Sequence, residues 1–326
     1  MKRKMLNVPK GGYDGMKGFT IVEFLVAGLL SVIVLIAVVS SYFTSRKLND
    51  AANERLAEQQ DLRNAATLIV RDARMAGSFG CFNMSEHTEK DVVDSSNQTL
   101  FFLAKPGAKQ ENKLISLKRS GIDNKLIPIA ESPNIRYQGF THRPNALIFQ
   151  YGIDDVNASA DTTVVSSCAA ISKPGKQILN LEDVKSELNI ASQDKQNGNI
   201  ARQRHVVNAY AVGRFGNNEE GLFRFQLNEK GEWGNPQLLA KKIKRMDVRY
   251  IYVSGCPEDE DAGKEEQFKY TDKFDKSKNA VTPAGVEVLL DSGGNAKIAA
   301  SSDNIIYAYR INATIRGGNV CANRTL

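Results

Sequence analysis

The chain has 326 residues, a net charge of +6 and a pI near 9.0. Apolar residues make up 42% and charged residues 25% of it, which are ordinary values for a folded protein and exclude a largely disordered chain. The length allows one sizeable globular body in addition to a membrane helix.

An uncharged apolar run from Phe24 to Val39 dominates the N-terminal part of the chain and extends with its flanks to about Phe43. A helix of about 20 apolar residues spans the hydrocarbon core of a bilayer, so this run predicts a single membrane-spanning segment. Basic residues precede the run, and the positive-inside rule therefore predicts a cytoplasmic N-terminus and an exported C-terminal part. These basic residues are Lys2, Arg3, Lys4, Lys10 and Lys17.

One acidic residue, Glu23, stands near the start of the apolar run. A carboxylate in a membrane segment costs about 2.5–3.5 kcal/mol, so Glu23 marks a candidate functional site. The stretch Lys17-Gly18-Phe19-Thr20, Glu23 and the uncharged helix together resemble the processing site of type IV prepilins. The resemblance implies that a membrane-bound prepilin peptidase cuts between Gly18 and Phe19 and methylates the new amine of Phe19. Residues 1–18 would then be a leader, and Glu23 would be the fifth residue of the mature chain.

A charge argument connects Glu23 with assembly. After cleavage, the α-amine of Phe19 would have a pKa of about 7.7–8.0 and would be mostly cationic at neutral pH. When helices pack side by side in a filament, the carboxylate of Glu23 loses water and needs a partner, because an unpaired buried charge is costly. We expect the amine of a neighbouring subunit to be that partner. The alternative is an uncleaved single-pass anchor in which Glu23 stays at the membrane interface.

Residues 44–77 are expected to continue the helix as an amphipathic half that ends at Gly77 and Gly80. Such a helix needs a cover for its apolar stripe, which we expect the exported body to provide; a coiled-coil partner helix is the alternative. The helix end, residues 71–77 followed by Gly80-Cys81, resembles that of minor pilins of the PilW group. The stripe consists of Leu48, Ala52, Leu56, Leu62, Ala66, Ile69 and Ala73.

Residues 78–326 are predicted to form a β-rich globular body. The clearest signal is a hairpin of Arg204–Phe215 and Leu222–Leu227, joined by a turn at residues 216–221. A short helix is expected at Leu181–Leu188, capped by Asn180, and a polar insertion is expected from Cys256 to about Pro283. The other predicted β runs are Thr99–Leu103, Lys113–Lys118, Ala146–Tyr151, Thr162–Ser167, Leu238–Val253, Val286–Leu290 and Ile305–Ile315.

Helix first and antiparallel sheet after it predict an α+β fold, in which a long N-terminal helix packs on an antiparallel β-sheet domain. The first half of this helix, residues 19–43, would span the membrane, as in a pilin. The hairpin at Tyr210 and the final strand around Arg310 also fit the layout of the PilW group.

Four cysteines, Cys81, Cys168, Cys256 and Cys321, follow the membrane segment. An even number in an oxidising compartment predicts two disulfides, and four cysteines allow three pairings. We favour Cys81–Cys168 and Cys256–Cys321, because sequential pairing closes the shorter loops.

No catalytic motif is present, so we expect neither an enzyme nor a bound cofactor or metal. The histidines His87, His142 and His205 lack metal-ligand spacing. The acidic run at residues 258–261 and the basic run at residues 241–245 are expected to be solvated, so nucleic-acid binding is not expected.

The resemblance implies a minor pilin that acts in type IV pilus assembly and enters the filament through its N-terminal helix. Its partners would be prepilin peptidase, other minor pilins, the major pilin and the assembly platform of the inner membrane. The chain would be anchored in the inner membrane with its body in the periplasm before incorporation into the pilus. Alternatives are a minor pseudopilin of a type II secretion system, or an adhesin or DNA-binding module carried on the filament.

Overall fold

The structure is a computed structural model and divides into two compact units, residues 1–57 and residues 58–326. The predicted strands Thr99–Leu103 and Lys113–Lys118, the acidic run, Cys256 and Cys321 lie outside the described residues. The described residues are 18–93, 126, 128–132, 135–144, 146–159, 162–174, 180–188, 190, 200–217, 220–228, 232–254, 267–272, 282–291 and 309–315.

The helix α1 (Ile21–Met75) contains 55 residues and confirms the predicted long N-terminal helix. Among the helices that the structure describes, α1 is the one long and apolar enough to cross a membrane. Its end is set by Gly77, whose positive φ of 80° is a conformation that side chains with a Cβ rarely adopt. The N–H of Gly77 leaves the helical pattern and donates to the carbonyl of Gln150 at 2.8 Å.

A nine-stranded sheet forms the larger part of the described body. Six of its strands follow the order β11-β10-β9-β7-β8-β3, and the other three, β4, β5 and β6, lie off this path. Strand β9 (Ala201–Phe215) is its centre: β10 (Glu220–Leu227) pairs with one edge, and β6 (Ala146–Ile153) with the other. The β9–β10 hairpin turns at Gly216, which has a φ of 55°, and confirms the predicted hairpin. The remaining strands are β3 (Val92–Val93), β4 (Ile129–Ser132), β5 (Phe140–His142), β7 (Thr163–Ser166), β8 (Ile171–Ser172) and β11 (Trp233–Lys241).

A second, four-stranded antiparallel sheet has the order β13-β12-β14-β15. Strand β15 shows the predicted alternation, because Ile311 and Ala313 are buried while Arg310 and Asn312 are exposed. The strands are β12 (Arg245–Ser254), β13 (Gln267–Thr271), β14 (Gly285–Asp291) and β15 (Tyr309–Thr314).

The structure corrects one prediction for this region and adds a strand to the segment of another. The run Leu238–Val253 is two strands in different sheets, β11 and β12, because the chain turns at Lys242 with a positive φ of 60°. The insertion from Cys256 to Pro283 contains strand β13, which pairs with β12 through residues such as Phe268 opposite Val253.

Short elements complete the described body. The helix α2 (Leu181–Glu187) begins as predicted, since the side chain of Asn180 accepts a hydrogen bond of 2.8 Å from the N–H of Asp183. The strands β1 (Ser78–Phe79) and β2 (Phe82–Asn83) pair directly after α1, and the single turns η1 (Met84–Glu86) and η2 (Glu89–Asp91) follow.

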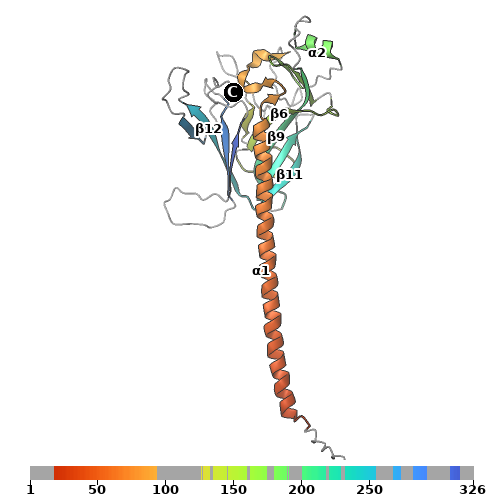
Figure 1. Cartoon of the computed structure of the whole chain (residues 1–326), viewed down its shortest axis with the longest axis vertical. Helices are drawn as coiled ribbons and strands as arrows, with labels where there is room; N and C mark the ends of the chain where they lie inside the picture. Colours follow the sequence, from red (N-terminus) through yellow and green to blue (C-terminus); the bar gives the residue numbers. More distant parts are fainter. Residues whose placement is uncertain are drawn as a thin grey trace, which may run out of the picture. The chain divides into compact units, whose positions relative to one another are not determined.

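The C-terminal turns of α1 share one hydrophobic core with residues of both sheets. Figure 1 shows this part of the helix beside β6, β9 and β11. The helix contributes Ala65, Ile69, Ala73 and Ala76, and three of these four are alanines, which lets the backbones approach closely. The opposite face of β9 and β10 forms a second core that includes Phe223 and Phe225, so the middle of β9 is buried on both faces.

The apolar stripe of α1 is covered over part of its length. Leu62 and Ala66 are half-buried against the core and Ile69 and Ala73 are fully buried, but Leu48 and Leu56 are 67% and 63% exposed. The expectation that the body covers the stripe is therefore confirmed for Leu62, Ala66, Ile69 and Ala73, which lie within residues 58–326.

Candidate functional site

The predicted cleavage position lies directly before α1, where residues Gly18 to Thr20 have no regular structure. Gly18 and Phe19, the residues on either side of the predicted cut, are both exposed, and Phe19 is 84% accessible. A Cβ added at Gly18 would meet nothing within 4 Å. The fold described around it therefore gives no steric reason for glycine at this position.

Glu23 and Thr20 form a reciprocal cap at the start of α1. The carboxylate of Glu23 accepts hydrogen bonds of 2.9 Å from both the N–H and the hydroxyl of Thr20. In return, the hydroxyl of Thr20 accepts a bond of 3.2 Å from the N–H of Glu23. This is a capping box, which satisfies backbone donors that a helix N-terminus leaves without partners. The sequence pattern Thr-x-x-Glu signals it, and the sequence analysis missed this role.

The apolar run behind Glu23 presents its side chains to the outside. The large apolar residues from Phe24 to Val39 are 42–75% exposed in the structure. The one hydroxyl in this run, that of Ser31, donates a hydrogen bond of 2.7 Å to the carbonyl of Ala27. This hydroxyl is therefore already hydrogen-bonded within the helix and needs no partner from an apolar environment. Such a surface is suited to lipid or to the helices of other subunits.

A buried carboxylate, Asp72, is the centre of the main polar cluster described in the body. It lies on the apolar face of α1, three residues after Ile69, and its side chain is fully buried. Its Oδ2 accepts hydrogen bonds from the hydroxyl of Tyr210 at 2.6 Å and from the Nδ2 of Asn208 at 2.8 Å. Its Oδ1 accepts a bond of 2.9 Å from the hydroxyl of Tyr151.

Two arginines balance the charge of Asp72. Arg224 lies 3.3 Å from Oδ2 and is largely buried, whereas Arg71 lies 3.2 Å from Oδ1 and is half exposed. Burial, the largest single cause, lowers the pKa of the Arg71 guanidinium, but the charge and hydrogen bond of Asp72 together with Tyr151 and Tyr210 outweigh it, and the net pKa is raised. A buried ion with this many donors has the compensation that desolvation requires.

The two tyrosines of this cluster remain neutral donors at physiological pH. Burial, followed by the charge of Asp72, raises the pKa of Tyr151 to about 12. The same two causes raise the pKa of Tyr210. Strands β6 and β9 place these donors side by side, since Tyr210 and Asn208 are two residues apart on one face of β9. Asp72 follows Ile69 of the apolar stripe by three residues, and an acidic residue at such a position is the signal in the sequence that points to a buried carboxylate.

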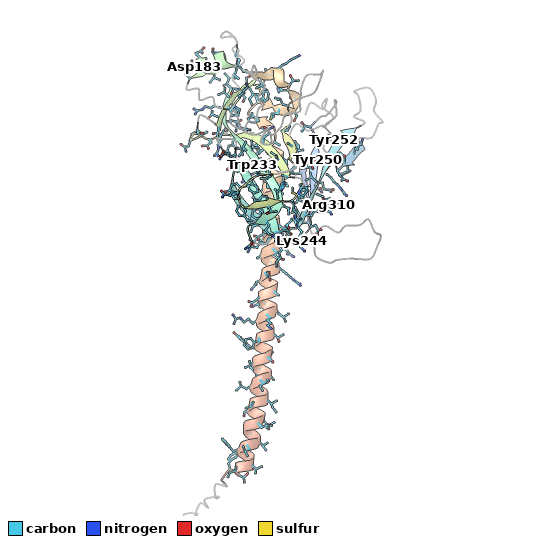
Figure 2. All side chains as sticks on the ribbon, turned by 180° about the vertical axis from the view of Figure 1, so that it is seen from behind. Asp183, Trp233, Lys244, Tyr250, Tyr252 and Arg310 are labelled. Atoms are coloured by element: carbon cyan, nitrogen blue, oxygen red, sulfur yellow. A yellow bond between two sulfur atoms is a disulfide. The ribbon has the colours of Figure 1, made fainter. Side chains whose placement is uncertain are left out.

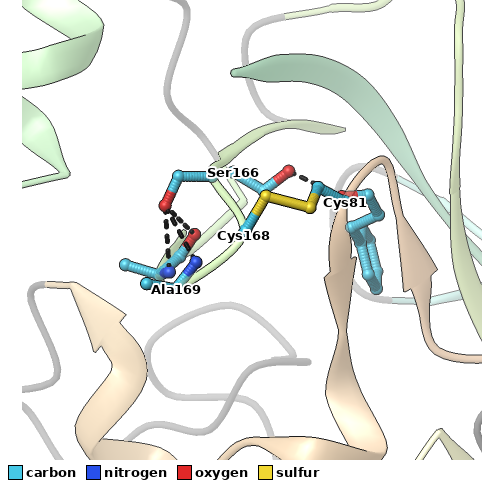
Figure 3. The surroundings of a disulfide bond; sticks show 7 residues. Cys81, Ser166, Cys168 and Ala169 are labelled. Atoms are coloured by element: carbon cyan, nitrogen blue, oxygen red, sulfur yellow. Dashed lines mark hydrogen bonds between the residues drawn. A yellow bond between two sulfur atoms is a disulfide. The ribbon is translucent and has the colours of Figure 1, made fainter. Parts of the chain in front are cut away.

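A disulfide joins Cys81 and Cys168, which is the first of the two pairs favoured by the sequence. Figure 3 shows how it links the turn between β1 and β2 to the loop after β7. Hydrogen bonds fix both sides, since the hydroxyl of Ser166 donates to the carbonyl of Phe79 at 2.8 Å, and that of Ser167 accepts from the N–H of Ala170 at 3.0 Å. The bond closes a loop with a sequence separation of 87 residues.

The three histidines lie at separate places. His87 stacks on Phe82 with ring centroids 4.2 Å apart, while His142 is on β5 and His205 on β9. Burial lowers the pKa of His205 to about 3, and burial also lowers that of His142 against the opposing hydrogen bond with Val212. Within the described residues, no group of three or more His, Cys, Asp or Glu side chains could hold a metal ion.

The basic run at residues 241–245 forms the turn from β11 to β12, where Lys244 lies in Figure 2. The ammonium of Lys242 is 2.6 Å from the carboxylate of Glu58 on α1, and the side chain of Ile243 is buried in the core. Part of this run therefore stabilises the turn.

No family model, curated protein or solved structure matches this chain. Three features of the chain bear on its function: an exposed bond before an apolar helix, a capping glutamate, and a disulfide-bonded body fixed to the end of the same helix.

Proposed function

We propose that the protein is a minor pilin of a type IV pilus, cut after Gly18, methylated at Phe19 and assembled through α1. The same proposal places α1 in the inner membrane and the body in the periplasm, and makes prepilin peptidase and other pilins its partners. Its fold would be that of a pilin, with the helix packed on antiparallel strands.

One observation carries this proposal. The bond between Gly18 and Phe19 is exposed and lies two residues before a helix whose apolar side chains are also exposed. Because the described fold has no steric need for glycine at position 18, a requirement of an external peptidase is a good reason for it. Likewise, an exposed apolar helix needs a bilayer or other helices around it.

The exported body supports a structural role. Asp72 fixes α1 to the sheet, and Arg249 forms an ion pair with Glu287 between neighbouring strands, so these polar residues have structural roles. The experiment that tests the proposal is deletion of the gene, with electron microscopy of surface pili and complementation by the wild-type chain. We expect fewer or no pili in the deletion strain; normal piliation would contradict the proposal.

A minor pseudopilin of a type II secretion system is the second candidate, because the same processing segment and helix suit it equally. The deletion strain separates the two if secretion of exported enzymes is measured beside piliation. Loss of secretion with normal pili would favour the pseudopilin.

A further inference from the structure

A groove with a volume of 580 Å³ lies along the C-terminal turns of α1, within the second unit. Its apolar lining consists of Ala66, Val70 and Met75 of α1 and Tyr309 of β15, all half-buried. The sequence analysis assigned no function to this part of the helix surface.

Three arginines also line this groove: Arg63, Arg71 and Arg74. They are eight and three residues apart, so they lie on neighbouring parts of one helix face. All three are exposed, and no acidic side chain is among the groove residues. No described residue forms an ion pair with Arg63 or Arg74, while Arg71 is bound to Asp72. The groove therefore combines an apolar lining with unneutralised positive charge.

The Asp72 cluster holds one of these arginines in place. The Oδ1 of Asp72 accepts hydrogen bonds from the Nε of Arg71 at 3.3 Å and from its Nη2 at 3.2 Å. Asp72 is itself fixed by Tyr151, Tyr210, Asn208 and Arg224. An arginine that is already ordered loses less side-chain entropy when it binds a carboxylate, so this arrangement favours binding.

We propose that the groove binds an acidic peptide segment of a partner protein. An apolar side chain of that segment would lie on Val70 and Tyr309, and its carboxylates would pair with Arg63, Arg71 and Arg74. Charge complementarity selects this occupant, because guanidinium groups bind carboxylates with paired hydrogen bonds. The inference concerns the unit formed by residues 58–326 and does not depend on the proposed function.

Peptide binding to the full-length protein in detergent tests the chemistry. The probes are two fluorescent peptides that alternate leucine with glutamate or leucine with lysine, and anisotropy gives the Kd. We expect the glutamate peptide to bind and the double variant Arg63→Glu, Arg74→Glu to weaken this binding about tenfold or more. The matched control is Arg202→Glu with Lys269→Glu, two exposed positions outside the groove that change the net charge equally and should leave the Kd unchanged. Equal binding by the groove variant, or equally tight binding of the lysine peptide, would overturn the proposal.

Crosslinking in cells tests the source of the segment. A photoreactive residue at Thr67, which lines the groove, is compared with one at the exposed Asn312 of β15. We expect the Thr67 position to crosslink a segment of another protein that contains acidic and apolar residues, and the arginine double variant to abolish this product. A product within a second copy of this chain, for example at its acidic run, would contradict the proposed partner. A product with a neutral or basic segment would contradict the proposed chemistry.

Discussion

The hydroxyl of Tyr210 donates a 2.6 Å hydrogen bond to the carboxylate of Asp72, and this bond joins the last turns of α1 to the central strand β9. Both side chains are buried, so water could not take the place of either partner if this hydrogen bond were lost. This contact therefore helps to fix the last turns of α1 to the sheet.

The first prediction concerns removal of this carboxylate. Asp72→Ala leaves Arg224 and three neutral donors without their acceptor, so the free energy of unfolding should fall by about 3–5 kcal/mol. Tyr210→Phe removes one hydrogen bond to a charged group and should cost about 1.5–3 kcal/mol. Urea unfolding followed by fluorescence of Trp233, the one tryptophan of the chain and buried in the body (Figure 2), measures both. If Asp72→Ala is no less stable than Tyr210→Phe, the cluster does not have the importance given to it.

Sequence patterns predicted the elements whose signals are local. The hairpin around Gly216 and the cap at Asn180 follow from turn and capping chemistry, and the alternation in β15 follows from one buried face. The turn at Lys242 escaped prediction because it contains neither glycine nor proline. Its left-handed conformation is stabilised by tertiary contacts, including the 2.8 Å bond from its N–H to the carbonyl of Glu220.

The candidate sites divide in the same way. Gly18, Phe19 and Glu23 could be proposed from the sequence because they stand in a short motif, and their roles remain predictions. The position of Asp72 on the apolar stripe indicates a buried carboxylate, but its partners could not be predicted, because they come from β6, β9 and β10, 79 to 152 residues further along the chain. Only the fold brings these donors together.

The second prediction concerns the disulfide between Cys81 and Cys168. Its loss should reduce stability by about 2–5 kcal/mol, the range typical of small secreted domains, because the unfolded chain gains freedom. Cys81→Ser should therefore lower the level of protein in the membrane, and alkylation under non-reducing conditions should label neither Cys81 nor Cys168 in the wild type. Labelling of both in the native protein would contradict an oxidised, exported body.

The third prediction concerns acid stability. The pKa of His205 is about 3 in the folded chain and about 6.5 when unfolded, so between these values the unfolded chain binds more protons. The contribution of this neutral histidine is complete above pH 6.5 and is lost as the pH falls. Between pH 7 and pH 5 the free energy of unfolding should decrease by about 2 kcal/mol from this group. His205→Asn should flatten the dependence on pH, and an unchanged slope in the variant would exclude His205 as its source.

The fourth prediction separates the two roles of Glu23. Glu23→Gln keeps an acceptor for the capping box but removes the charge, whereas Glu23→Leu removes both. If the carboxylate pairs with the amine of a neighbouring Phe19, both variants should be inserted and cleaved yet crosslink poorly to partner pilins, since breaking a buried pair costs about 3–5 kcal/mol. The measurement is crosslinking in the membrane at equal protein level. Wild-type crosslinking by Glu23→Gln would leave helix capping as the function of this residue.

Mass spectrometry of the N-terminus of the membrane-purified protein tests the central claim most directly. We predict a mature chain that begins at Phe19 and carries one methyl group on its amine. We also predict that Gly18→Val retains residues 1–18 without a change in the Trp233 unfolding curve, because a side chain at this position meets no described atom within 4 Å. An intact leader in the wild type, or a mature terminus at any other residue, would contradict the account.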